Sequence, residues 1–301
     1  MKIIAIILTV DQRERTLQCL DSLTKRNKPT FSVLVWDNGS QDGTIEAIQA
    51  AFPDVNVHRH TSNLGVASGR NAAAELAIKV FTPTHLLFLD NDMTFEDNFV
   101  NALGEPFLQD PKIGQTQAKL LLQEDRSRLN DGGGIYINFF TGKITPIGYG
   151  EIDRGQYDFT RKCIAIGGAM MVRTDVFQQL HGFDATFDPF GPEDLDFSLR
   201  LQKTGYSALF VPQAVAYHAV SHTFGKGYSE EYARSKIRHW HIFVRRHASP
   251  LQQLGFFLIG GPYRMILAIL RESRNSNKGG VRGLVQGLLD LSWFTYPTSL
   301  R

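Results

Sequence analysis

The sequence predicts an α/β fold with a mostly parallel central sheet, and three observations favour it. Short apolar runs alternate with helical patterns through the first hundred residues, an order typical of parallel sheets with right-handed crossovers. The run 86–89 is apolar throughout, as expected for a strand buried on both faces. It leads directly into Asp90 and Asp92, and open α/β sheets bind ligands at the carboxyl ends of their strands.

The composition is that of an ordinary folded protein. The 301 residues are 43% hydrophobic and 21% charged, with a formal net charge of +2. So weak a charge does not favour nucleic acid as a partner. Two cysteines, Cys19 and Cys163, make no disulfide framework, so a reducing, cytoplasmic location is expected.

The apolar residues 3–8 follow Lys2 and could imitate a secretory signal. Charged residues begin again at Asp11, with no small-residue cleavage site between. We therefore expect residues 2–10 to form the first buried strand.

The next elements are predicted from apolar periodicity and turn-forming residues. Further strands are expected at 32–36, 55–57 and 85–90, helices at 11–26, 44–52 and 71–80, and loops at 37–43 and 63–71. The pattern becomes irregular after residue 110. Strands are expected there at 113–122, 134–138, 143–147, 208–211 and 214–220, with a buried run at 163–172 and a helix at 174–180.

The segment 191–205 carries conflicting signals. Leu195, Phe197, Leu199 and Leu201 alternate, which favours a strand. The ends favour a helix, because a proline and acidic residues open the segment and Gly205 closes it. We predict a helix that begins near Glu193.

The C-terminal part is predicted to be a helical appendage. A basic helix is expected at 230–246, an apolar stretch at 254–270, a polar loop at 272–280 and a helix at 281–294. The apolar stretch is interrupted by Gly260–Pro262 and Arg264 and is shorter than the ~20 residues that span a bilayer. We therefore expect a catalytic domain over 1–229, with a nucleotide-binding half at 1–110 and an acceptor half at 111–229, and a tail over 230–301.

Asp90 and Asp92 are the strongest candidates for a metal site. Residues two apart in an extended segment point the same way, and two neighbouring carboxylates suit Mg²⁺ or Mn²⁺, which also binds phosphate oxygens. An Asp-Asn-Asp turn with no metal is the alternative.

Several short motifs occur in a specific order. They are Val35-Trp-Asp-Asn-Gly-Ser-Gln-Asp-Gly-Thr44, Asn63-Leu-Gly-Val-Ala-Ser-Gly-Arg-Asn71, Leu89-Asp-Asn-Asp92, Gly167-Gly-Ala-Met-Met-Val172, Gly182-Phe-Asp184 and Glu193-Asp-Leu-Asp196. In this order and spacing the chain resembles the family 2 glycosyltransferases, inverting enzymes of the GT-A fold, and among them the bacterial rhamnosyltransferase type. The resemblance covers roughly residues 2–247.

The resemblance implies a role for each matched position. Asp194 would be the catalytic base, and Asp90, Asp92 and His218 would hold the divalent cation, Mn²⁺ or Mg²⁺. The donor-binding residues would be Thr9, Asp37, Asn63, Gly65, Arg70, Asn71 and Asp90. Gly168 and Glu193 would lie on the acceptor side. The Gln-x-x-Arg-Trp signature of processive synthases is absent, and Arg238-His-Trp240 does not replace it.

The implied activity is metal-assisted transfer of a sugar from a dTDP-, UDP- or GDP-linked donor to a hydroxyl, in cell-surface polysaccharide or glycolipid synthesis. A nucleotidyltransferase, an inactive nucleotide-sugar-binding module and a retaining transferase remain as alternatives. The acceptor could be a lipid-linked glycan. Basic and aromatic residues in the tail suit either peripheral binding to an anionic membrane or a homodimer interface.

Overall fold

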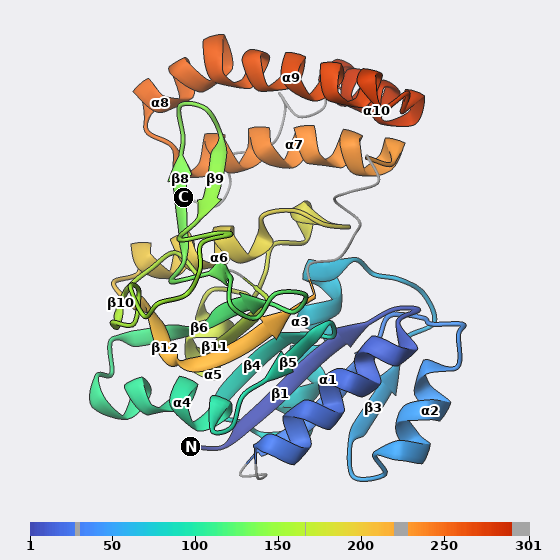
Figure 1. The fold of residues 1–301 in the computed structure, drawn as a ribbon, viewed down its shortest axis with the longest axis vertical. Coiled ribbons are helices and arrows are strands. Elements are labelled where there is room, and N and C mark those ends of the chain that lie inside the picture. Colours follow the sequence, from blue (N-terminus) through green and yellow to red (C-terminus); the bar gives the residue numbers. More distant parts are fainter. Residues whose placement is uncertain (28–30, 166, 220–227, 291–301) are drawn as a thin grey trace. The chain divides into compact units, whose positions relative to one another are not determined.

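The computed structural model describes residues 1–27, 31–165, 167–219 and 228–290 (Figure 1). The chain divides into two compact units. The first comprises Met1–Tyr136, Thr145–Ala185 and Asp194–Val220, and the second comprises Ile137–Ile144, Thr186–Glu193 and Ser221–Arg301. The first unit carries the central sheet, and the second carries the C-terminal helices.

The central sheet is mixed, with a parallel half built from the N-terminal strands. Its strands are β1 (Ile3–Thr9), β2 (Phe31–Asp37), β3 (Asn56–Arg59), β4 (His85–Asp90), β5 (Met93–Phe95), β6 (Ile113–Leu122), β7 (Leu129–Asp131), β10 (Arg161–Lys162), β11 (Ala169–Arg173) and β12 (Ser207–His218). Their order is β10-β12-β6-β11-β4-β1-β2-β3, with β5 paired to β12 and β7 to β6. Strands β3, β2, β1 and β4 are parallel, as predicted, while β11 runs antiparallel between β4 and β6.

Helices cover both faces of this sheet (Figure 1). They are α1 (Arg13–Arg26), α2 (Thr44–Ala51), α3 (Val66–Phe81), α4 (Phe99–Gln109), α5 (Thr174–Gln179) and α6 (Glu193–Lys203). Alternate residues of β1 enter different cores. Ile7 belongs to a buried cluster that includes residues of α1, α2 and α4, and Ile6 to one that includes residues of α3, α5 and α6. Burial on both faces explains the uninterrupted apolar runs of β1 and β4.

Two element boundaries differ from the prediction in ways that affect the site. Helix α3 begins at Val66 rather than residue 71, because Gly65 adopts φ +89° and ends the loop there. Arg70 and Asn71 are therefore helical residues. The expected strands 208–211 and 214–220 are one strand, β12, whose register shifts between Val211 and Val215, so Pro212 is accommodated without ending the strand. Val220 lies outside the described residues.

The segment 191–205 contains a helix, as its ends predict. Helix α6 begins at Glu193 and ends at Lys203. Leu195, Phe197 and Leu201 are buried, so the misleading alternation reflects burial of the helix on more than one side. Within the buried run 163–172, strand β11 begins at Ala169, and residue 166 lies outside the described part.

The second unit contains most of a hairpin and the C-terminal helices. Its elements are β8 (Ile135–Asn138), β9 (Lys143–Pro146), the 3-10 turn η1 (Ala185–Phe187), α7 (Glu230–His247), α8 (Pro250–Gly255), the π-helical turn η3 (Phe256–Gly260), α9 (Gly261–Arg274) and α10 (Lys278–Leu289). Helix α10 begins before the predicted residue 281, and residues 291–294 lie outside the described part.

Residues 250–274 form one continuous helix, which corrects the expectation of an interrupted segment too short to span a bilayer. Pro262 lies near the start of α9, directly after the π-helical turn Phe256–Gly260. The wider turn changes the backbone hydrogen-bond spacing there, so the helix continues through the glycines and the proline. Within the described residues this is the helix that could cross a membrane by length and composition alone.

Candidate active site

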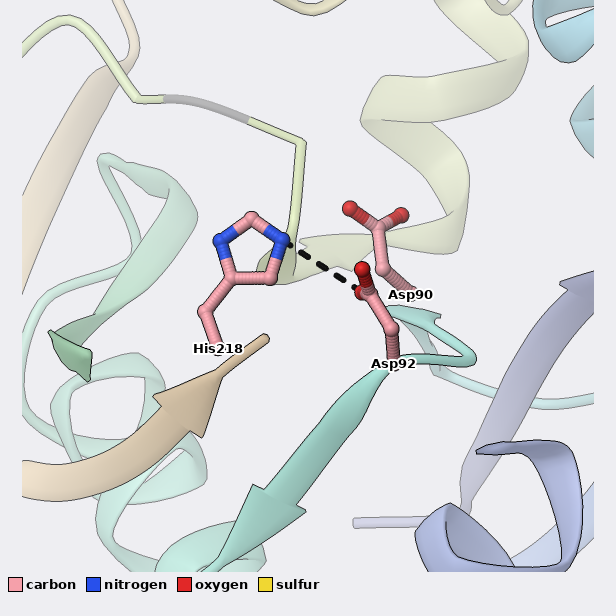
Figure 2. Close-up of side chains that lie close together, drawn as sticks. All are labelled: Asp90, Asp92 and His218. Atoms are coloured by element: carbon pink, nitrogen blue, oxygen red, sulfur yellow. Dashed lines mark ion pairs between the residues drawn. The ribbon is translucent and has the colours of Figure 1, made fainter. Parts of the chain in front are cut away.

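Two aspartates and a histidine meet where β4, β5 and β12 converge. Asp90 ends β4, Asp92 follows in the turn before β5, and His218 ends β12. Met93 of β5 pairs with His218 of β12, which brings the histidine from more than one hundred residues away. One ligand atom from each of the three side chains lies within 4.8 Å of the others, and Figure 2 shows the three side chains grouped at this point.

Hydrogen bonds fix the orientation of the histidine ring. The His218 Nε2 atom lies 3.4 Å from Asp92 Oδ1, and Nδ1 lies 3.0 Å from Asn130 Oδ1. Both oxygens are acceptors, so the protonated ring donates from Nδ1 to Asn130 and from Nε2 to Asp92, and Nε2 faces the aspartates. Burial lowers the pKa of His218, but the hydrogen bond to Asp92 and the charges of Asp92 and Asp90 outweigh it, so the pKa is raised above its ordinary value.

The donor set fits a divalent cation. Two carboxylates and one imidazole are acceptable ligands for Mn²⁺ or Mg²⁺, and three protein ligands leave coordination positions for phosphate oxygens. Without a metal, two arginines partly offset the repulsion between the Asp90 and Asp92 carboxylates. Arg70 lies 2.7 Å from Asp90 Oδ1, and Arg15 lies 3.8 Å from Asp92 Oδ2.

Arg70 connects this cluster to the start of α6. Its guanidinium, largely buried, contacts Asp90 and also donates to the Gly167 carbonyl at 3.3 Å. The Gly167 N–H donates to Asp194 Oδ2 at 2.6 Å. A Cβ atom on Gly167 would lie 2.7 Å from the Arg70 guanidinium and 3.1 Å from Asp194 Oδ2, so a larger residue would displace one of these side chains.

Asp194 is partly exposed, but its carboxylate lies where few solvent molecules can reach it. Burial raises its pKa above the ordinary value, although the N–H of Gly167, the charge of Arg70 and the N–H of Leu195 act in the opposite direction. The Leu195 N–H lies 2.7 Å from Oδ1. A carboxylate whose pKa is raised is the stronger base once it is ionised.

The two residues expected on the acceptor side adjoin this chain of contacts. The Gly168 carbonyl accepts the Asp90 N–H at 2.9 Å, and a Cβ atom there would lie 2.4 Å from Met93 Cε. Glu193 precedes Asp194 in the chain. It is buried in the second unit, and its Oε2 accepts the Gly191 N–H at 3.3 Å.

The loop after β2 and the loop before α3 are joined by Asn38. Its Nδ2 donates to Asn63 Oδ1 at 2.9 Å and to the Gly65 carbonyl at 3.1 Å. Asp37 is fully buried, and its carboxylate accepts the Ser40 N–H at 3.1 Å. Three of the expected donor-binding residues, Asp37, Asn63 and Gly65, are thus held in one hydrogen-bonded region.

Two expected donor-binding residues are directed elsewhere. Both polar atoms of the Asn71 amide bind the backbone of Phe183, at 2.7 and 2.9 Å. Thr9 Oγ1 lies in a buried network, 2.8 Å from Thr16 Oγ1 and 3.1 Å from Asn91 Nδ2. In this structure both side chains connect elements of the fold.

Sequence reasoning missed Asn130, Asn38 and Asn91. Each contacts a candidate residue through its side-chain amide. Asn130 contacts His218, Asn38 contacts Asn63, and Asn91 contacts Thr9. Asn38 and Asn91 stand within the quoted motifs, which is a signal that could have found them. Asn130 has no motif, because its position depends on the pairing of β7 with β6.

Comparison with known proteins gives a consistent result. The family model "Glycosyl transferase family 2" matches residues 4–180, more than half of the chain. A second model, "N-terminal domain of galactosyltransferase", matches residues 155–223. A Mycobacterium tuberculosis protein named N-acetylglucosaminyl-diphospho-decaprenol L-rhamnosyltransferase is 25% identical over 293 residues, covering 90% of this chain and 94% of that protein.

Solved structures share the fold at low sequence identity. GalNAc-T7 with UDP, GalNAc and Mn²⁺ superimposes with a TM-score of 0.59 at 17% identity, over 78% of this chain and 48% of that one. A mannosyltransferase from Pyrobaculum calidifontis with GDP-Man and Mn²⁺ gives 0.55 at 17% identity, over 96% and 74%. These neighbours confirm the predicted GT-A fold with its mostly parallel sheet and flanking helices.

Proposed function

Because this chain belongs to glycosyl transferase family 2 and is therefore a glycosyltransferase, we propose that it moves a sugar from a nucleotide diphosphate to an acceptor hydroxyl with inversion. The observation that carries the proposal is the chain of contacts from Asp90 through Arg70 and Gly167 to Asp194. It joins a cluster suited to a diphosphate and its counter-ion with a carboxylate suited to a general base.

Each group at the proposed site has one task. Asp194 accepts the proton of the attacking hydroxyl as the new bond forms. Asp90, Asp92 and His218 would hold a divalent cation, whose charge would neutralise the leaving diphosphate. Arg70 fixes Asp90 relative to the Gly167 backbone and hence relative to Asp194, so that base and leaving group lie on a common framework. A single displacement inverts the anomeric carbon.

The donor and acceptor are proposed from the Mycobacterium tuberculosis relative, which aligns over 90% of this chain. We place dTDP-rhamnose first among the donors, before UDP- and GDP-sugars, and a lipid-linked sugar diphosphate as the acceptor, at the cytoplasmic face of the membrane. The half 1–110 binds the nucleotide, and the half 111–229 binds the acceptor.

A transfer assay tests this directly. The purified protein is incubated with N-acetylglucosaminyl-diphospho-prenol and each of the three donor classes in Mn²⁺, and the product anomer is assigned by NMR. We expect one donor class to give an inverted product. A product of retained configuration would refute the single displacement, and donor binding without transfer or hydrolysis would favour an inactive binding module. The family match sets the nucleotidyltransferase alternative aside.

The affinity of the site for Mn²⁺ is expected to fall as the pH is lowered through the pKa of His218. The metal needs a bare Nε2, so protons compete with it. Because the pKa of the metal-free protein is raised above 6.5, the loss begins near neutral pH and approaches about tenfold per pH unit below the pKa. Titration of free Mn²⁺ by electron paramagnetic resonance measures this. His218→Gln should bind Mn²⁺ more weakly than wild type, and its affinity should no longer fall with pH in this range. A wild-type affinity that is flat between pH 8 and 6 (roughly one unit on either side of neutrality) would remove His218 from the ligand set.

Asp37→Ala is expected to raise the donor KM about tenfold, the value of one or two hydrogen bonds, with little change in kcat. Contacts to the nucleotide base are made equally in the ground and transition states. Ser40→Ala is the matched control, because it removes the hydroxyl that binds Asp37 but leaves the carboxylate. Equal KM values for both variants would mean that Asp37 only shapes the turn.

A further inference from the structure

The continuous helix Pro250–Arg274 exposes a long aliphatic stripe. Eight large apolar residues on it each leave between 47% and 72% of their surface exposed: Leu251, Leu254, Leu258, Ile259, Tyr263, Ile266, Leu267 and Leu270. Their spacing of mostly three and four residues places them on one face. At 1.5 Å per residue the helix is about 37 Å long. The stripe is therefore an extended apolar surface, unlike the single exposed apolar side chains that are common on soluble proteins.

The opposite face of the helix is fixed within the second unit. Phe256 and Met265 are buried, Met265 in a cluster with α7 and α10. Gly260 packs so closely on the hairpin that a Cβ atom would lie 2.0 Å from the Phe140 carbonyl oxygen. Arg264, the single charged residue in the sequence 251–270, donates to the Gly142 carbonyl at 2.7 Å, which directs its charge to the hairpin.

The charge around the stripe is positive. Between residues 249 and 289 the sequence has five basic residues, Arg264, Arg271, Arg274, Lys278 and Arg282, and one acid, Glu272. Glu272 is fully buried, and its carboxylate accepts from Arg271 at 2.9 Å, the Tyr228 N–H at 3.0 Å and Asn277 at 2.6 Å. Arg271, Arg274 and Lys278, at the end of α9 and the start of α10, are exposed, whereas Arg282 pairs with Glu230 at 3.6 Å. The exposed cations at this end of the stripe therefore outnumber the exposed acids.

We propose that this face, the α8–α9 stripe, inserts in the plane of an anionic lipid surface. Aliphatic side chains with basic residues beside them are the composition of an interfacial helix, in which apolar residues enter the acyl boundary and cations meet lipid phosphates. The stripe contains one side-chain polar atom, the Tyr263 hydroxyl, whereas a protein interface combines its apolar centre with hydrogen-bonding groups and aromatic anchors.

In-plane insertion fits this helix better than a membrane span. A span would surround the helix with acyl chains and remove Phe256, Met265 and Glu272 from their protein contacts. The buried carboxylate of Glu272 would then lose the partners that satisfy it, at high cost in hydrocarbon. Lying in the interface leaves those contacts intact and covers only the exposed stripe.

The inference does not depend on the proposed donor, acceptor or reaction, and it is tested without substrate. Full-length protein is floated on vesicles of phosphatidylcholine with and without phosphatidylglycerol. We compare wild type with the double variant L258D/I259D and with the matched control Leu108→Asp, because Leu108 on α4 is as exposed as the stripe residues, at 72%. Circular dichroism and Tm verify that each variant is folded.

Wild type and Leu108→Asp should float with the anionic vesicles, less so at high salt, and L258D/I259D should show a partition coefficient at least about tenfold lower. Alkaline carbonate should release wild type from cell membranes. The proposal is overturned if wild type stays unbound to anionic vesicles, or if L258D/I259D floats equally well. Retention in carbonate would mean that the helix spans. A wild-type dimer that L258D/I259D converts to a monomer, with neither form floating, would show that a second copy covers the stripe.

Discussion

Replacing Asp194 with asparagine is expected to lower kcat by about 10²–10⁴-fold, the usual contribution of a general base. Asparagine keeps an oxygen that can accept the Gly167 or Leu195 N–H, so the start of α6 should stay folded. It cannot take the proton of the acceptor hydroxyl. Donor binding, which we propose involves the cluster at Asp90 and Asp92, should change little.

The measurement is steady-state kinetics of transfer together with donor binding by calorimetry. Asp175→Asn is the control, since that carboxylate pairs with Arg173 at the surface and should leave kcat unchanged. Loss of donor affinity with retained turnover would move Asp194 from catalysis to binding.

Replacing Asp92 with asparagine is expected to abolish cation-dependent transfer, with a loss of at least about 100-fold at moderate Mn²⁺. The substitution removes a charged oxygen from a group of three ligands that lie within 4.8 Å of one another. It also removes the charge that faces His218 Nε2. Mn²⁺ affinity, measured in the absence of donor, should fall in parallel with activity.

Asp97→Asn is the matched control, because Asp97 lies a few residues further along and its side chain is 79% exposed. It should bind Mn²⁺ as wild type does. Full activity of Asp92→Asn, or wild-type activity that EDTA does not diminish, would exclude the assigned metal site.

The sequence predicted the parallel half of the fold well because local pattern and tertiary role agree there. Strands β1 and β4 are buried on both faces and read as continuous apolar runs. Helix α6 was predicted against its own alternation because its end signals were strong. The long helix 250–274 was not predicted, since two glycines and a proline indicate a break, and only the packing of Gly260 on the hairpin shows why glycine is needed there.

The candidate site was predictable to the extent that its residues stand in motifs at strand or helix ends. Asp90, Asp92 and His218, which the resemblance assigned to one cation, lie close together. Arg70, expected on the donor side, pairs with Asp90. Asn71 and Thr9 also stand in or near motifs, yet their polar atoms bind Phe183 and a buried network. A motif gives a residue's place along the chain, but the direction of its side chain depends on the pairing of distant elements, such as β5 with β12.

The most direct test of the account is a thermal-shift measurement on the purified chain with dTDP-, UDP- and GDP-sugars, each in Mn²⁺ and in EDTA. A ligand that binds the folded state alone stabilises it by ~2.7 kcal/mol at a hundredfold excess over Kd. We predict that at least one nucleotide sugar raises Tm in Mn²⁺ and that the shift is lost in EDTA and in Asp92→Asn. No shift with any donor class, or a shift of equal size in EDTA, would contradict a cation-assisted nucleotide-sugar site at Asp90, Asp92 and His218.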